Sequence, residues 1–448
     1  MIDTDTALAR CNDLVALARS MGADAADAVA RADFSESVSV RLGELEDVER
    51  SEGEEIGLRV FVGKRSASIH TSDFEPEGLR ALAQRAVEMA RHAPEDPYAG
   101  LAAPEQLFDG EMPDLQLLDP AEVDPAVLRE AALAAEDAAR AVEGVTNSNG
   151  GSATSSRAVV ALVTSHGFAR GYSGSGFSYS AAVIAGEGSE MQTDYASRSA
   201  RFYEDLPAPA EIGREAGERT VAKVSPVSLP SGKMPVVFDP RVGGGLLGHL
   251  IGAMSGPAIA RKSSFLLGRE NEELFDSSIR IIEDPFQLRG LRSRPFDGEG
   301  VPCTRRPLVE NGRITGWLTN VASARQLGLG LTGHAARSGG GSPGVSASNG
   351  YLEAGDVTPQ ELMADIEDGL YVTGLFGQGV NMVTGDYSRG ATGIRIRNGE
   401  MAGPVAEITI AGSLPDMFRA MTPANDLEMF RAVNVPTLRI DGMTVAGE

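Results

Sequence analysis

Histidine and cysteine supply many of the metal ligands and nucleophiles of proteins, and this chain contains few of either. Its histidines are His70, His92, His166, His249 and His334, and its cysteines are Cys11 and Cys303. Their spacing matches neither the i, i+4 pair of helical zinc ligands nor the Cys-x-x-Cys pair of a sulfur site. His249 stands apart because it lies in an apolar, glycine-rich segment, Gly-His-Leu-Ile-Gly-Ala at 248–253. An imidazole there can accept a proton near neutral pH, whereas Gly248 and Ala253 carry no donor atom for a metal.

Two other motifs resemble catalytic signatures but lack the required context. Gly374–Gly379 reads Gly-Leu-Phe-Gly-Gln-Gly, yet neither a helical pattern nor a suitably spaced acidic residue follows it, as a dinucleotide site requires. Gly174-Ser175-Gly176 lies between strand-like residues and not in the strand–turn–helix context of a nucleophilic serine. We therefore predict neither a nucleotide site nor a serine nucleophile from these motifs.

The element that must position His249 is itself apolar. Val242–Ala260 is the longest apolar stretch of the chain, and it follows the strand-like Met234–Phe238. Its glycines, histidine and proline form a combination that is rare in membrane-spanning helices. We therefore predict a buried helix over about 241–256.

The first half, residues 1–224, shows one order of elements twice: helix, strands, helix. The predicted elements are a helix at 4–21, strands near 37–42, 56–62 and 66–71, a helix at 76–91, a connector at 93–120, a helix from the Asp124 cap to Gly144, strands near 157–164, 167–173 and 176–185, and a helix near 209–224. The acidic segment Glu44–Glu55 indicates a solvated hairpin. We expect an N-terminal domain with helices packed on a mixed or antiparallel sheet. Duplication and chance repetition both stay open.

Residues 225–233 interrupt both periodicities with two prolines and a glycine, so we predict a linker there. Residues 234–448 then favour a β-rich C-terminal domain, which makes the fold class α+β. Tight hairpins are expected at Asn311-Gly312, Asn398-Gly399 and Asp441-Gly442. One helix interrupts this half, with a capping box at Thr358–Glu361 and an end at Gly369.

Several segments of the C-terminal half occur together in the order typical of one family. They are Asn311–Leu318, Ala322–Gly328 continuing into Thr332–Ala336, Gly369–Val372, Val383–Ala391 and Ile408–Leu414. Each is weak alone, but together they make the chain resemble the TldD/PmbA family, once called modulators of DNA gyrase. The resemblance covers nearly the whole C-terminal half and is weaker before residue 230.

The resemblance indicates which family motif corresponds to residues 248–253. Peptidase members of the family carry a zinc-binding His-Glu-x-x-x-His there, so Gly248 and Ala253 replace the two ligands and His249 replaces the catalytic glutamate. A further cysteine of TldD-like chains has no counterpart in Asn425–Val445. The chain thus resembles the PmbA or TldE branch, which implies no metal bound by this chain and zinc in a TldD-like partner. We interpret His249 mainly as a structural or interface residue.

Four further positions are candidates for a substrate cleft within this resemblance. His334 precedes the glycine-rich stretch Ser338–Gly344, which indicates either a loop at the cleft or a surface loop without a ligand. Thr384, Gly385 and Asp386 end a strand-like run and offer backbone donors and a carboxylate. An extended peptide could add there as an extra strand; alternatively, the segment is a turn in which Asp386 binds its own backbone.

Charge limits the choice of partner. Forty Lys plus Arg against sixty-three Asp plus Glu give a formal charge of -23, which disfavours direct binding to nucleic acid or to anionic membranes. The start of the chain lacks the pattern of a signal peptide, and the two cysteines suggest no disulfide, so we expect a cytoplasmic protein. A homodimer is expected when the chain is expressed alone.

These observations favour a non-metallated subunit that shapes the peptide-binding cleft of a zinc metallopeptidase complex, with an unfolded or extended peptide as substrate. Whether the chain alone is an enzyme is left open. One alternative is a regulatory protein that binds DNA gyrase or a toxin–antitoxin component. A second alternative is an independent hydrolase that uses other residues.

Overall fold

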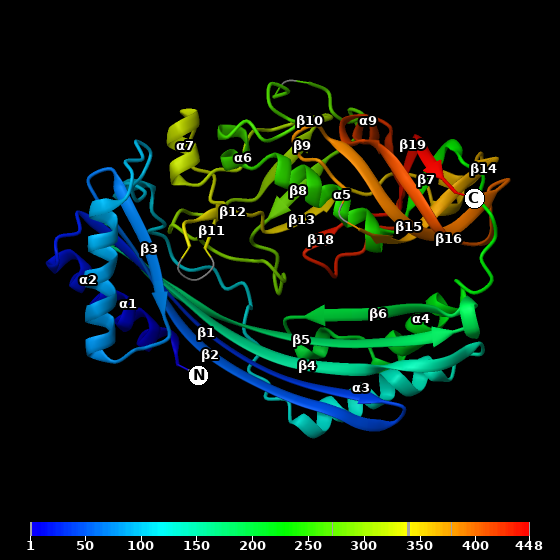
Figure 1. Ribbon diagram of the computed structural model, residues 1–448, viewed down its shortest axis with the longest axis horizontal. Coiled ribbons are helices and arrows are strands. Elements are labelled where there is room, and N and C mark those ends of the chain that lie inside the picture. Colours follow the sequence, from blue (N-terminus) through cyan, green and yellow to red (C-terminus); the bar gives the residue numbers. More distant parts are fainter. Residues whose placement is uncertain (1, 271, 338–340, 378, 448) are drawn as a thin grey trace.

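The computed structural model describes residues 2–270, 272–337, 341–377 and 379–447. Its first sheet has six antiparallel strands in the order β3-β2-β1-β4-β5-β6. The strands are β1 (Ala25–Arg41), β2 (Glu44–Val62), β3 (Arg65–Thr71), β4 (Val145–Thr164), β5 (Ala169–Ala185) and β6 (Gln192–Ala200). Because β1, β2, β4 and β5 are each 17 to 20 residues long, one curved sheet extends along most of the molecule (Figure 1).

Four helices cover one face of this sheet. They are α1 (Thr4–Ser20), α2 (Pro76–His92), α3 (Pro125–Arg140) and α4 (Pro209–Val221). Side chains of a strand alternate between faces, so Ala28 and Ala30 of β1 pack with α1 and α2, while Ala153 and Tyr179 pack with α3. The opposite face of the sheet is turned toward the C-terminal half (Figure 1).

The C-terminal half contains a ring of strands, a second sheet and a short ribbon. The ring is β7 (Gly232–Phe238), β14 (Asp368–Phe376), β15 (Asp386–Arg397), β16 (Glu400–Ser413) and β19 (Leu438–Ala446), with β17 (Met421–Pro423) attached to β19. It closes because β16 pairs with both β15 and β19. The second sheet is β8 (Ile281–Asp284), β9 (Arg306–Glu310), β10 (Arg313–Ile314), β13 (Asn349–Leu352) and β18 (Val433–Asn434), and the ribbon is β11 (Ala335–Ala336) with β12 (Gly344–Val345).

Short helices connect the strands of the C-terminal half, and three 3-10 helices lie in the N-terminal half. The former are α5 (Pro240–Ala253), α6 (Gly256–Ala260), α7 (Val321–Leu327), α8 (Pro359–Met363) and α9 (Leu414–Arg419), and the 3-10 helices are Pro104–Gln106, Gly188–Glu190 and Tyr203–Asp205. The longest of them, α5, crosses the middle of the C-terminal half (Figure 1). Its Leu246 and Leu250 are at most 1% exposed and belong to one core cluster with Phe238 and Phe418.

The α+β class and most predicted helices are confirmed. α1, α2, α3 and α4 lie within a few residues of the predicted ranges, and Asp124 caps α3 by accepting a hydrogen bond from Ala126 N. The predicted hairpins at 311–312 and 398–399 join β9 to β10 and β15 to β16. The apolar stretch forms two helices, α5 and α6, because the chain leaves the helical conformation at Ser255.

Other predictions were wrong in instructive ways. The strands predicted at 167–173 and 176–185 are the single strand β5, and β6 was missed. Glu44–Glu55 is the exposed part of β2, with the hairpin turn before it at Leu42-Gly43. Asp441-Gly442 makes no hairpin because it is a register shift inside β19, and Gly369 lies in β14, beyond the end of α8. No helix in the described ranges is long and apolar enough to span a bilayer.

Candidate functional site

Helix α5 is positioned by the strand before it. β7 ends at Phe238, and Asp239 caps the helix by accepting a hydrogen bond from Arg241 N at 2.8 Å. Pro240 occupies the first helical position, where its missing N–H costs nothing. The helix therefore begins directly at the end of a buried strand, and this fixes which of its residues face the core.

Residues 248 and 253 lie on different sides of α5. Gly248 is exposed, and a Cβ built on it meets no atom within 4 Å. Ala253 is 1% exposed within the main core cluster, and its carbonyl accepts a hydrogen bond from Ser264 Oγ at 2.7 Å. One side chain position is open to solvent and the other is filled by core packing.

These residues do not fit a zinc ion. Zinc takes nitrogen, sulfur or carboxylate oxygen ligands, and neither glycine nor alanine supplies one. Across the described ranges, no three His, Cys, Asp or Glu side chains are grouped so that they could hold a metal ion. Side chains at positions 248 and 253 of α5 therefore cannot bind a metal ion.

His249 is the one ionisable residue in the segment 248–253. Its ring is half-buried and meets the ring of Tyr387 edge-on, with 6.2 Å between centroids. Burial lowers the pKa of His249, and the positive charge of Arg389 lowers it further. Burial also raises the pKa of Tyr387 to about 12. At neutral pH the pair is therefore a neutral imidazole against a neutral phenol.

The segment Thr384–Asp386 forms a turn before β15, not the end of a strand. Thr384 Oγ1 donates to Asp386 Oδ2 at 2.6 Å, and Asn381 Oδ1 accepts from Val383 N at 2.9 Å. On one side Asp386 pairs with Ser413 of β16, and on the other its carbonyl accepts from Asn381 N. Within the described residues, both backbone edges of β15 are therefore occupied at Asp386.

His334 lies inside the protein and not on a surface cleft. Its imidazole is 2% exposed and bridges Thr332 Oγ1 at 2.8 Å and Glu283 Oε2 at 2.5 Å. Burial alone would raise the pKa of Glu283, but hydrogen bonds from His334 and Ser348 outweigh it and hold that pKa low. Of the glycine-rich stretch that follows, residues 338–340 lie outside the described residues.

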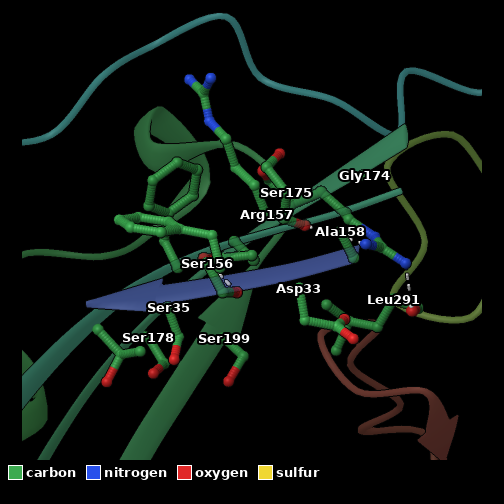
Figure 2. Close-up of a pocket in the computed structure, with 16 residues that line it drawn as sticks. Asp33, Ser35, Ser156, Arg157, Ala158, Gly174, Ser175, Ser178, Ser199 and Leu291 are labelled. Carbon is green, nitrogen blue, oxygen red and sulfur yellow. Dashed lines mark hydrogen bonds between the residues drawn. The ribbon is translucent and has the colours of Figure 1, made fainter. Parts of the chain in front are cut away.

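A pocket that the sequence interpretation missed lies on the inner face of the first sheet. Its volume is about 410 Å³, and Ser35, Ser156, Ser178 and Ser199 line it from four neighbouring strands. Figure 2 shows the hydroxyl groups of Ser35, Ser178 and Ser199 on the same side of the sheet. Arg201 closes one end by donating to the carbonyl of Leu291 at 2.7 Å. In the sequence, the pattern that could have indicated this pocket is the alternation of serine and threonine with apolar residues in β4 and β5.

Sequence comparison assigns the long curved sheet and the closed ring of strands to a known family. Profiles described as PmbA/TldA metallopeptidase domain 1, central domain and C-terminal domain match residues 26–90, 118–224 and 231–447. The chain therefore belongs to the PmbA/TldD metallopeptidase family.

Two named relatives cover almost the whole chain. The metalloprotease PmbA of Escherichia coli O157:H7 is 40% identical over 415 residues, which is 92% of this chain and 90% of that protein. A metalloprotease PmbA homolog of Haemophilus influenzae is 37% identical over 437 residues, 97% of this chain and 94% of the relative.

Solved structures share the fold. A Bacteroides thetaiotaomicron protein described as a candidate modulator of DNA gyrase superposes with a TM-score of 0.91 at 26% identity, covering 100% of both chains. TldE from Thermococcus kodakarensis superposes with a TM-score of 0.85 at 22% identity, covering 97% of this chain and 99% of its own. At that identity the second match shows the fold alone.

Proposed function

We propose that this chain is the non-metallated subunit of a PmbA/TldD-type peptidase and that a TldD-like partner supplies the zinc. One observation carries the proposal: Gly248 and Ala253 offer no donor atom, and Ala253 is packed into the core. The scaffold around them is nevertheless complete, because α5 is capped and the ring of strands closes. A role in binding accounts for a retained scaffold without ligands.

The proposed role is to shape the cleft that holds an unfolded or extended peptide. The hydroxyl-lined pocket supports it, because short hydroxyl side chains can hydrogen-bond peptide groups with little preference for sequence. The face of α5 that carries Gly248 and His249 is a second candidate for the contact with the partner or peptide, while Thr384, Gly385 and Asp386 are assigned a structural turn.

The test is a cleavage assay on an unstructured peptide. The TldD-like partner is measured alone and with this chain, and we expect cleavage to depend on both. Ser178→Leu fills the hydroxyl-lined pocket and should raise KM, whereas Ser39→Leu, on β1 outside that pocket, serves as the matched control. Equal rates for the partner with and without this chain would overturn the proposal.

Regulation by protein binding is the second candidate, favoured by the charge of -23 and by the gyrase name of a structural neighbour. It predicts a salt-sensitive complex with gyrase that forms without the TldD-like partner. The absence of a complex at low ionic strength would count against it. An independent hydrolase is the third candidate, and activity of the purified chain alone on the same peptide would favour it.

Two properties accompany the main proposal. We propose a cytoplasmic location and a homodimer when the chain is expressed alone. Light scattering tests the dimer, because a mass near the 46.9 kDa of one chain would contradict it.

A further inference from the structure

A second pocket, of about 210 Å³, lies where the first sheet meets the C-terminal half. β1 contributes Arg31, the segment before β9 contributes Arg294 and Asp297, and Arg337 follows β11. It shares no lining residue with the hydroxyl-lined pocket. Nothing in the proposed peptidase role accounts for three arginines in this place.

These arginines carry buried donors without acceptors. The Nε atoms of Arg31, Arg294 and Arg337, and Nη2 of Arg337, are buried and meet no hydrogen-bond partner among the described residues. Other arms of the same groups are engaged: Arg31 Nη2 donates to the carbonyl of Arg337 at 2.5 Å, and Arg294 Nη2 to that of Ser346 at 2.6 Å. Buried donors are almost always satisfied, so a cluster of unsatisfied ones indicates an acceptor from outside the chain.

The neighbouring charges leave this pocket positive. Arg337 is paired with Asp27, which also pairs with Arg59, and Arg59 in turn pairs with Glu299. That network contains two acids and two bases. In the described part of the chain, no carboxylate oxygen lies within 4.0 Å of a guanidinium nitrogen of Arg31 or Arg294. Neither positive charge is therefore balanced by an ion pair.

Asp297 is the remaining acid in the pocket wall. Its oxygens already accept hydrogen bonds from Val301 N at 3.0 Å and Ala335 N at 2.9 Å. Burial, and then the negative charge of Glu299, raise the pKa of Asp297 to about 7. Its carboxyl is therefore partly protonated near neutral pH and repels an incoming anion less than an ordinary aspartate does.

The pocket also has apolar walls, to which Tyr172 and Ser346 add two hydroxyl-bearing residues. Val29, Leu162 and Phe296 line the pocket beside the guanidinium groups. Its volume corresponds to the share of about seven water molecules in the liquid, less than a drug-sized site requires. Guanidinium groups bind planar carboxylates with two parallel hydrogen bonds. We propose that this pocket binds the carboxylate of a small apolar acid, with the three arginines on the carboxylate and Val29, Leu162 and Phe296 on the apolar group.

The last residue of a peptide and a free short-chain acid share this chemistry, so the probes must separate them. Calorimetric titration of the full chain uses N-acetyl-leucine, N-acetyl-leucinamide, 4-methylpentanoic acid and inorganic phosphate. We expect saturable binding of at least one of the two acids and binding of the amide that is at least about tenfold weaker. Tighter binding of N-acetyl-leucine identifies a peptide end, and tighter binding of 4-methylpentanoic acid identifies a free acid; either supports the proposal.

Variants assign the binding to the pocket. Arg294→Gln and Arg31→Gln should each weaken binding of the acid by about tenfold, which is the loss of about 1.4 kcal/mol. Arg292→Gln is the matched control, because Arg292 is exposed, lies two residues away and does not line the pocket. No saturation by either acid, equal binding of phosphate, or unchanged binding in both variants would overturn the proposal. The comparison of acid with amide in the wild type decides it even where a variant fails to fold.

Discussion

Helix α5 and the arginine pocket (Arg31, Arg294, Asp297 and Arg337 with their apolar neighbours) present opposite mismatches. In α5, the helix is capped and its inner face is packed, but Gly248 and Ala253, which the family resemblance aligns with zinc ligands, carry no donor atoms. In the arginine pocket, four buried donor atoms lack an acceptor. The first region has kept its architecture without its chemistry, and the second holds chemistry that no described residue satisfies. The difference shows that a family assignment locates the first region but does not find the second.

The largest expected effect concerns the buried ion-pair network of Asp27, Arg59 and Arg337 beside the arginine pocket. Asp27→Ala should lower the free energy of unfolding by about 3 to 5 kcal/mol, because it leaves Arg59 and Arg337 as buried charges without their shared partner. Urea denaturation measures this change. Asp33→Ala, at an exposed position on the same strand, is the control and should change stability by less than about 0.5 kcal/mol. Similar losses in both variants would mean that the network does not hold the pocket.

The next prediction compares the stability cost of a histidine at position 253 with the cost at position 248 of α5. Ala253→His should cost about 1 to 3 kcal/mol through overpacking, because position 253 is filled by the core. Gly248→His should be tolerated, since its side chain enters open space. Thermal unfolding of both variants checks this. If Ala253→His is as stable as the wild type, the core at position 253 has room that the structure does not indicate.

The third prediction concerns how the free energy of unfolding depends on pH through Asp297 of the arginine pocket. The pKa of Asp297 is raised from 3.8 to about 7 on folding, so the folded state holds a proton that the unfolded state releases. This contribution to stability is present below about pH 4 and is lost as pH rises toward 7, by at most about 1.4 kcal/mol per pH unit.

The variant Asp297→Asn isolates that term from the other carboxylates, several of which have lowered pKa values and act in the opposite direction. Between pH 5 and pH 7, the wild type should lose stability relative to the variant in urea denaturation. A constant difference across this range would show that Asp297 stays ionised.

The smallest expected effect is on the exposed face of α5. Gly248→Ala should raise the free energy of unfolding by about 0.5 to 1 kcal/mol, because glycine in a helix interior is less stable than alanine and the new methyl group meets nothing. Chemical denaturation measures the gain. A loss of stability would indicate that the glycine is needed for a close contact in this chain.

The sequence was sufficient where a local signal was strong. Asp124 before Pro125 and the box at Thr358–Glu361 predicted helix starts correctly because each cap forms within four residues. Asn311-Gly312 and Asn398-Gly399 predicted hairpins for the same reason. Asp441-Gly442 is a similar hairpin signal but lies in β19, where pairing with β7 on one edge and β16 or β17 on the other overrides the turn.

The candidate sites needed contacts between distant residues. The lack of ligands at Gly248 and Ala253 could be read from the sequence, whereas the burial of Ala253 and His334 could not, because it depends on the packing of separate elements. The arginine pocket joins residues 31, 294 and 337, which share no motif or spacing. The serine alternation in β4 and β5 was visible, but the sequence did not show that this face lines a pocket.

We propose that the chain retains a peptidase scaffold without a zinc site of its own. Elemental analysis of the full chain, purified after exposure to excess zinc and extensive dialysis, tests it most directly. We expect far less than one zinc per chain, with Gly248→Ala no different from the wild type. One tightly held zinc per chain in the wild type would contradict it.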